Sequence, residues 1–195
     1  MVKIRRLLVP STVAVTVTNA GKNAKRKICI HETGNRKIAA NADAHARLQA
    51  KGNSRQASWH WTVDNNEAVQ SFTHEARCWA AGTGQGNNEA IHIEICVNSD
   101  GNYQKAVDNA AQLTAKILKD EKLTISDVVQ HNHYSGKNCP EIMRSGKEIT
   151  WQQFLKMVEG YLQPVKEKEV RTMEFSSPAL KNETETTLAS AARRK

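Results

Sequence analysis

The chain has 195 residues and a formal charge of +8 at pH 7, with 39% apolar and 25% charged residues. A chain of this length and composition can form one domain with a substantial core, plus a tail. No segment approaches the ~20 uninterrupted apolar residues of a membrane span, so we expect none. The positive charge predicts attraction to polyanions. Lysine and arginine are scattered rather than gathered on one helix, so we expect no nucleic-acid partner.

The N-terminal stretch is interpreted as a strand rather than as a signal peptide. Basic residues precede apolar ones there, but Pro10, Ser11 and Thr12 interrupt the apolar run and no clear cleavage site follows. We therefore expect a strand over Ile4 to Val9, an extended segment over 13–18, and no signal peptide. Without export, the four cysteines are expected to be buried free thiols plus one metal ligand.

The first half of the chain combines predicted strands with one helix. The apolar run from Ile28 ends at His31 and predicts a buried strand with an imidazole at its tip. A helix is predicted over 38–51, where Ala and Leu favour helix formation. Alternation over 58–63, a turn at 64–67 and a second run over 68–72 predict a hairpin.

The second half predicts a glycine-containing loop over 78–86, a strand over 90–98 and an amphipathic helix over 103–118. Residues 123–130 then lead back towards the sheet. Thr150 is a plausible N-cap for a last helix. Strands and helices mixed in this order, with one hairpin, predict an α/β fold in which a central mixed sheet is flanked by helices.

The composition changes at the C-terminal end of this unit. Residues 163–172 are charged and carry few core residues, which is typical of a linker. Ser177 and Pro178 then resemble the start of a helix. We therefore expect a domain over 1–162, a linker over 163–172, and over 173–195 the truncated start of a further module.

A metal centre is predicted from three separate segments. The stretch HNHYSGKNCP places His131, Lys137 and Cys139 within ten residues, and imidazole and thiolate ligands suit zinc. A third ligand is available in His31. The strand AIHIEICVN carries Glu94 on the face opposite its isoleucines, where a carboxylate beside a metal could transfer protons.

These segments, in this order, resemble the zinc-dependent N-acetylmuramoyl-L-alanine amidases of the amidase-2 type. More narrowly, residues 4–162 are similar to phage endolysins and prophage autolysins of Gram-positive hosts. The spacing of His131 and Cys139, followed by proline, carries most of the resemblance, and the strand of His31 alone is a weak motif. The resemblance implies the fold of peptidoglycan-recognition proteins, with a zinc site at one end of the sheet.

The resemblance also implies roles for single residues. His31, His131 and Cys139 would bind Zn²⁺, Glu94 would act as general base and then acid, and Lys137 would stabilise the oxyanion. The amide between N-acetylmuramic acid and L-alanine in bacterial peptidoglycan would be cleaved, which causes lysis. Such a protein is made in the host cytoplasm and acts on the cell wall after release, and its positive charge would also attract anionic wall polymers.

Some positions depart from the family pattern. Trp59 stands where some relatives carry a catalytic tyrosine, and Ala80 stands where many carry a histidine. The first departure places more weight on Glu94, and the second means that the histidine is not essential here or that its task has moved to another residue. We interpret His60, His74 and His92 as residues that support the ligands or lie on the surface, with His60 as the best candidate for support. Trp61 and Trp79 would wall a groove or lie in the core.

Three other functions compete with the amidase. A peptidoglycan-recognition module would bind wall fragments without cutting them, but non-catalytic relatives typically lose the cysteine that is present here as Cys139. A zinc peptidase would cut within the stem peptide. A glycosidase would need a second acid facing Glu94, and Asp64 lies in a predicted turn, so it is a poor candidate for that role.

Overall fold

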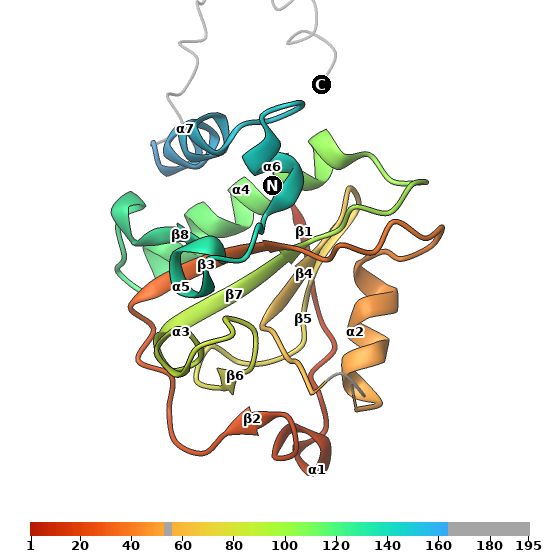
Figure 1. Cartoon of the computed structure of the whole chain (residues 1–195), viewed down its shortest axis with the longest axis vertical. Coiled ribbons are helices and arrows are strands. Elements are labelled where there is room, and N and C mark those ends of the chain that lie inside the picture. The colour runs from red at the N-terminus through yellow and green to blue at the C-terminus, as the bar shows by residue number, and fades with distance from the viewer. Residues whose placement is uncertain (53–55, 164–195) are drawn as a thin grey trace, which may run out of the picture. The chain divides into compact units, whose positions relative to one another are not determined.

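A mixed, six-stranded sheet forms the centre of the protein, in a computed structural model that describes residues 1–52 and 56–163 (Figure 1). The strands follow one another across the sheet in the order β1 (Lys3–Arg6), β5 (Glu67–Gln70), β4 (Trp61–Val63), β7 (Ala90–Ile95), β3 (Lys27–Glu32) and β8 (Val128–Gln130). Only β4 and β5 pair antiparallel in this sheet as described, and they form the predicted hairpin. The predicted mixed sheet is therefore confirmed.

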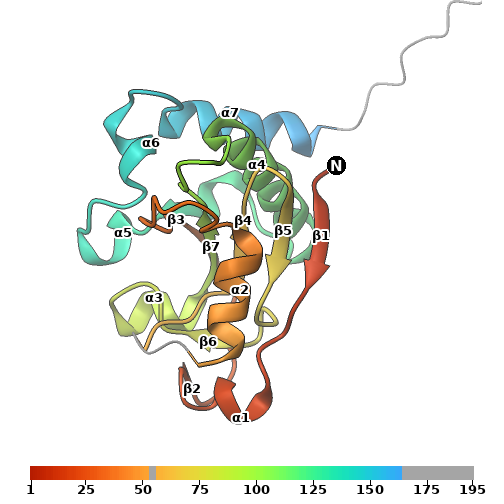
Figure 2. The ribbon, with the colours of Figure 1, turned by 90° about the vertical axis from the view of Figure 1, so that its right-hand side faces the viewer.

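Helices cover both faces of the sheet (Figures 1 and 2). The isoleucines of β3 and β7 form one buried cluster with side chains of α4 (Tyr103–Asp120) and α7 (Trp151–Leu162). Ala68 of β5 belongs to this cluster. Its neighbour Val69 instead packs with α2 (Ala42–Ala50). Because successive strand residues point to opposite faces, α2 covers the face that α4 leaves free.

The ends of the long helices agree with the sequence. Asn102 caps α4 by accepting a hydrogen bond from the backbone N–H of Lys105 at 2.9 Å. Thr150 and Gln153 form a reciprocal capping box at the start of α7, which confirms the predicted N-cap. Helix α2 begins later than predicted, after Asn41, whose side chain accepts from Ala44 N–H. Residues 38–41 therefore precede the helix.

Shorter elements surround the sheet. These are α1 (Ser11–Ala14), β2 (Thr18–Asn19), β6 (Arg77–Cys78), α3 (Gly84–Glu89), a 3-10 turn (Ile125–Asp127), α5 (Asn132–Ser135) and α6 (Glu141–Ser145). The extended segment predicted over 13–18 is wrong at its start, because the Pro10 carbonyl accepts from Val13 and Ala14 and begins a helical turn. The loop predicted over 78–86 is also partly wrong. Thr83 accepts from Gly86 N–H and thereby caps α3.

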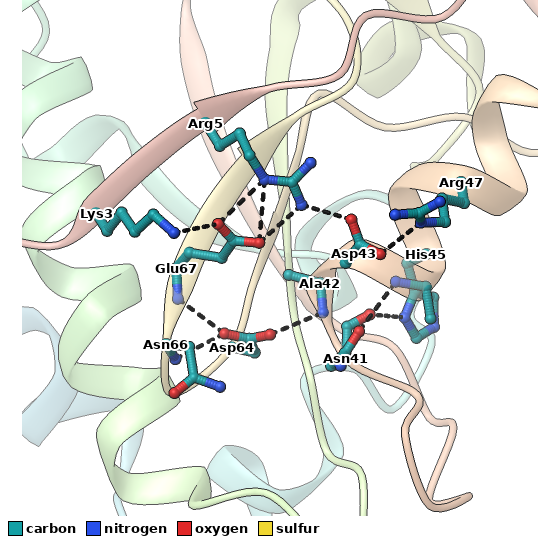
Figure 3. A network of polar contacts seen from close by, with 11 residues as sticks. Lys3, Arg5, Asn41, Ala42, Asp43, His45, Arg47, Asp64, Asn66 and Glu67 are labelled. Atoms are coloured by element: carbon teal, nitrogen blue, oxygen red, sulfur yellow. Dashed lines mark hydrogen bonds and ion pairs between the residues drawn. The ribbon is translucent and has the colours of Figure 1, made fainter.

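An ion-pair network joins β1, β5 and α2 (Figure 3). The guanidinium of Arg5 donates to Glu67 Oε1 at 2.7 Å and to Asp43 Oδ1 at 2.6 Å. Asp43 also accepts from Arg47. Asp64, in the hairpin turn, accepts from the backbone N–H of Ala42 at the start of α2. We call Arg5, Asp43, Arg47 and Glu67 the Arg5 network, and it fixes α2 against the edge of the sheet.

The tail prediction lies almost entirely outside the described residues. The predicted linker, 163–172, begins at Gln163, which directly follows α7. Gln163 is the one residue of the predicted linker and module that the structure describes. Within residues 1–52 and 56–163, no helix is both long and apolar enough to cross a membrane.

Candidate metal centre

Parallel pairing places the predicted ligands at one edge of the sheet. β3 lies between β7 and β8 and runs parallel to both, so all three strands end at the same edge. His31 is directly opposite Glu94 in the register, and His131 follows the last residue of β8. Because β3 and β7 alternate, their isoleucines enter the core while His31 and Glu94 face the other side. The carboxyl ends of parallel strands are a common position for binding sites in α/β proteins.

Two histidine rings meet at this edge. His31 Nδ1 lies 3.0 Å from His131 Nδ1, and the two side chains come from strands that adjoin in the sheet. The backbone N–H of His131 donates to the carbonyl of Ile30 at 3.1 Å, which continues the β3–β8 pairing up to the ligand. Burial lowers the pKa of both imidazoles, that of His31 most strongly. Both rings are therefore neutral at pH 7, which is the form that binds metal.

A tight loop returns Cys139 to the end of β8. After α5 the chain turns at Gly136, whose φ of 71° lies in the left-handed region that favours glycine. The Asn132 N–H then donates to the Cys139 carbonyl at 3.0 Å, and the Asn132 side chain donates to the Lys137 carbonyl at 2.9 Å. These bonds close the loop across eight residues of sequence and place the thiol beside His131.

Glu32 fixes the far side of the same loop. Its carboxylate accepts the backbone N–H groups of Ile142 and Met143, at 2.8 and 3.2 Å, and the hydroxyl of Tyr103 at 2.5 Å. Ile142 and Met143 lie in α6, shortly after Cys139. The segment that carries the thiol is thus attached to the turn after β8 on one side and to β3 on the other.

The three predicted ligands converge. The ligand atoms of His31, His131 and Cys139 all lie within 4.8 Å of one another, and all three residues are buried. Burial raises the pKa of the Cys139 thiol to about 12, and the backbone N–H of Glu32 and the ammonium of Lys137 oppose this. A thiol in such a place becomes a thiolate when a cation binds it. Two neutral imidazoles and one thiolate are a donor set that fits Zn²⁺.

Glu94 lies beside this cluster with a strongly perturbed carboxyl group. Its Oε1 is 4.0 Å from His31 Nδ1, and its Oε2 is buried without a hydrogen-bond partner. Burial raises its pKa to about 8, Lys137 lowers it and Glu32 raises it further. A buried carboxyl without partners is unfavourable unless something at the site uses it. A cation at the three ligands would favour its charged form.

A groove of about 410 Å³ opens onto the cluster. Lys137 lines it together with Glu94, His131 and Cys139. Its walls are completed by Glu32, Thr33, Asn35, His45, Leu48, Ala57, Trp59, Trp79 and Ala80. The sequence did not decide whether Trp61 and Trp79 line a groove or lie in the core. In the structure Trp79 lines the groove and Trp61 lies in the main core.

Of the three other histidines, the structure favours His92 rather than His60 as the one that supports a predicted ligand. His60 is fully buried but bonds to the Ala76 carbonyl and not to a ligand. His74 bonds to Trp61 and Glu121. His92 is the one of the three that contacts a ligand, since its Nδ1 lies 3.1 Å from His31 Nε2. Its place in β7, two residues before Glu94 and on the same face, was a signal that could have ranked it above His60.

Two further features at the site were missed. Helix α2 contributes His45 and Leu48 to the groove, which no local pattern indicates because it depends on how α2 packs. Cys29, two residues before His31, lies with His31 and His92 in a second group whose ligand atoms are within 4.8 Å. The prediction of free thiols is confirmed, since Cys29, Cys78, Cys96 and Cys139 are all unpaired and buried.

Comparisons with known proteins show to which family the chain belongs. The Amidase_2 family, described as N-acetylmuramoyl-L-alanine amidase, matches residues 21–142. The chain is 37% identical over 135 residues to the N-acetylmuramoyl-L-alanine amidase XlyA of Bacillus subtilis (strain 168), which covers 68% of this chain and 44% of XlyA. It is 36% identical over 143 residues to CwlH of the same strain, covering 72% of this chain and 55% of CwlH. The chain thus spans about half the length of these curated relatives.

Solved structures give the same result. The catalytic domain of XlyA superposes with a TM-score of 0.72 at 32% identity, over 80% of this chain and 99% of that domain. The structure of PlyL superposes with a TM-score of 0.71 at 29% identity, over 80% of this chain and 96% of PlyL. The family match, over residues 21–142, spans the chain from before β3 to the start of α6. The chain belongs to the Amidase_2 family of N-acetylmuramoyl-L-alanine amidases.

Proposed function

We propose that this protein is a zinc-dependent N-acetylmuramoyl-L-alanine amidase. It hydrolyses the amide between the lactyl group of N-acetylmuramic acid and L-alanine in bacterial peptidoglycan, and so lyses the wall. The observation that carries the proposal is the convergence of His31, His131 and Cys139 beside Glu94, whose Oε2 has no hydrogen-bond partner, at a groove that Glu94, His131 and Cys139 line. The relatives named as amidases support the choice of bond.

Each residue has a chemical task in this proposal. His31, His131 and Cys139 hold Zn²⁺, which when bound polarises the scissile carbonyl and makes water a better nucleophile at neutral pH. Glu94 takes a proton from the attacking water and delivers it to the departing amine of L-alanine. The high pKa that burial gives this carboxyl suits a group that must both accept and return a proton. Lys137 supplies a positive charge for the oxyanion of the tetrahedral intermediate.

The groove supports a polymeric substrate. Trp59 and Trp79 line it, together with Glu32 at the end of β3 and Asn35 in the chain that follows that strand. Aromatic and polar side chains of this kind suit a sugar ring joined to a peptide. The charge of +8 adds attraction to anionic wall polymers in the vicinity of the substrate.

The structure gives little support to a glycosidase. The second carboxyl in the groove belongs to Glu32, and its two oxygens already accept three hydrogen bonds from Tyr103, Ile142 and Met143. The Asp64 carboxylate accepts backbone N–H groups from Ala42 and its own turn. Neither acid is available to act opposite Glu94 as glycoside hydrolysis requires.

We further propose that residues 1–162 are the catalytic domain, that 163–172 are a linker, and that 173–195 begin a wall-binding module. The end of α7 at Leu162 supports the first boundary. In this proposal the protein is made in the host cytoplasm and reaches the wall after release, as an endolysin or autolysin does.

The proposal is tested by digesting purified Gram-positive wall and analysing the fragments by mass spectrometry. New amino-terminal L-alanine without new reducing sugars is the expected result. New reducing ends would instead indicate a glycosidase, new termini within the stem peptide would indicate a peptidase, and wall binding without any cleavage would indicate a recognition module. The Glu94→Gln variant, digested in parallel, controls for contaminating hydrolases.

A further inference from the structure

His31 contacts a different imidazole through each of its ring nitrogens. Nδ1 lies on the side of His131 and Glu94, at 3.0 Å from His131 Nδ1 and 4.0 Å from Glu94 Oε1. Nε2 lies 3.1 Å from Nδ1 of His92. His31 and His92 are 1% and 0% exposed, so no solvent competes for either contact. The two sides of the ring therefore have separate roles.

We propose that His92 is a positioning residue for the metal ligand His31. It accepts the N–H of His31 Nε2 on its own Nδ1, and thereby fixes which nitrogen of His31 faces the metal. This inference rests on the proposed zinc site. The neighbouring His60 hydrogen-bonds to the backbone N–H of His92 and to the Ala76 carbonyl rather than to a proposed ligand.

The proton assignment follows from the chemistry of imidazole. A neutral imidazole that binds a metal through one nitrogen carries its proton on the other. Nδ1 of His31 faces the other proposed ligands, so the proton of His31 lies on Nε2. The atom opposite Nε2, which is Nδ1 of His92, must therefore be a hydrogen-bond acceptor. His92 then presents the lone pair of Nδ1 and carries its own proton on Nε2. The wrong tautomer of His31 would place an N–H where the ion must bind.

His92 is itself held in place by its neighbours. Its backbone N–H donates to Nδ1 of His60 at 2.9 Å, and its carbonyl accepts from the His60 N–H at 3.2 Å. The rings of His60 and His92 stack at 5.6 Å with an interplanar angle of 25°. His60 Nε2 donates to the Ala76 carbonyl at 3.0 Å. Two layers of fixed groups thus stand behind His31, which suits a residue that must orient a ligand.

A second metal ion is the competing interpretation of the same residues. Cys29, His31 and His92 also bring their ligand atoms within 4.8 Å of one another. An ion there would need a thiolate from Cys29, which is 0% exposed, and neither Cys29 nor His92 lines the groove that leads to the centre. The hydrogen bond needs no thiolate and no second cation, so we favour it; it leaves Nε2 of His92 buried without a hydrogen-bond partner among the described residues. Metal stoichiometry separates the two interpretations.

Paired variants of the full chain test the inference through zinc affinity, measured by competition with a chromophoric chelator. His92→Phe keeps a ring but removes the acceptor, whereas His92→Asn places an amide oxygen near the position of Nδ1. We expect His92→Phe to weaken zinc binding by roughly 10–100-fold, as for other partners of metal ligands, and His92→Asn to restore most of it. His74→Phe is the matched control, because His74 is half-enclosed by Trp61 and Glu121 and contacts no ligand.

The outcomes are distinguishable. Unchanged zinc affinity in His92→Phe, with normal binding by the wild type, would overturn the positioning role and leave the proposed function intact. Equal weakening in His92→Phe, His92→Asn and His74→Phe would indicate a structural effect and also overturn it. A wild-type chain that binds no zinc would end both proposals. Two zinc ions per chain, reduced to one by Cys29→Ser, would replace the hydrogen bond with a second site.

A measurement on the unaltered, zinc-loaded protein keeps the test independent of how the variants fold. Nitrogen-15 NMR of the histidine rings should show His31 protonated on Nε2, and His92 protonated on Nε2 with its Nδ1 as acceptor. A coupling across the hydrogen bond between the two rings would identify the pair. His92 protonated on Nδ1 instead would contradict the inference.

Discussion

The Arg5 network and the candidate metal centre are both built from charged or titratable side chains. They differ in how completely these side chains are paired with partners of opposite charge or with hydrogen-bond partners. In the Arg5 network each carboxylate meets a cation, and hydrogen bonds to Arg5 and Arg47 lower the pKa of Glu67 and Asp43. In the metal centre burial lowers the pKa of His31 and raises that of Glu94 and Cys139, and one oxygen of Glu94 has no partner.

This difference separates a structural cluster from a functional one. The Arg5 network is complete within the protein and joins a helix to the edge of the sheet, so its effect should be on stability. The metal centre brings together groups that oppose one another until a cation binds, so it should make the fold less stable in exchange for chemistry. Substitutions in the two regions should therefore differ in which property they change.

The largest effect is expected from removing the thiol of Cys139, which we propose as a zinc ligand. In Cys139→Ser we expect zinc affinity to fall by more than roughly 100-fold, the upper end of what the loss of a residue that supports a ligand causes. Lysis should be lost as well, because a hydroxyl is a poor ligand for zinc. Metal content per chain and turnover on purified wall measure the two effects. A Cys96→Ser variant, at a buried thiol outside the groove, is the control and should keep its zinc. Full zinc content in Cys139→Ser would remove Cys139 from the ligand set.

Glu94→Gln should separate catalysis from metal binding. The amide cannot accept a proton, so turnover should fall by about 10²–10⁴-fold while zinc content stays near that of the wild type. The same wall-digestion assay and the same metal analysis measure both. Undiminished turnover would exclude Glu94 as the base, and loss of zinc together with activity would assign it to the metal's ligands.

The same variant should stabilise the protein once metal is removed with a chelator. The pKa of Glu94 is about 8 in the folded protein against 4.5 unfolded, so folding opposes its ionisation and stability falls as the pH rises from 4.5 through 8. Glu94→Gln removes this penalty. We expect a gain on the order of 4 kcal/mol near the upper end of that range, and none below pH 4.5. Urea denaturation at several pH values measures it, and a gain independent of pH would contradict the assignment.

The sequence predicted the main elements and the convergence of the ligands because both depend on local patterns. The isoleucines that alternate with His92 and Glu94 fixed the orientation of β7, and the short spacing from His131 to Cys139 limits how far the two can separate. The short helix α3 was not predicted, because it depends on the side chain of Thr83 capping a glycine-rich turn. Such a turn has no apolar periodicity from which to infer a helix.

Long-range packing explains what the sequence could not provide. The alternation in β7 shows that His92 shares a face with Glu94, but its contact with His31 follows only once β3 and β7 are neighbours in a known register, which pairs Cys29 with His92. The Arg5 network is similar. Arg5 and Glu67 are 62 residues apart, and nothing near either one indicates that β1 and β5 lie side by side.

Arg5→Met should test whether the network acts on stability alone. Its loss leaves Glu67, whose side chain is 12% exposed, without its main partner, and we expect unfolding to become easier by about 1–3 kcal/mol. Zinc affinity and turnover should not change. Because the pKa of Glu67 is lowered in the folded protein, the difference from the wild type should shrink as the pH falls through that pKa. Lys3→Met is the control, since Lys3 is 73% exposed and lies 3.5 Å from Glu67.

The smallest effect is expected from substituting Arg47. This substitution tests whether burial or contact distance determines the strength of an ion pair in the Arg5 network. Arg47 Nε lies 2.5 Å from Asp43 Oδ2, closer than Arg5 lies to either carboxylate, but its side chain is 69% exposed and Asp43 keeps Arg5 as a partner. Arg47→Gln preserves helix propensity and should lower stability by only about 0.3–0.5 kcal/mol. Added salt should erase this difference and affect Arg5→Met less. If Arg47→Gln costs as much as Arg5→Met, the strength of the network follows contact distance, and burial is not what makes it structural.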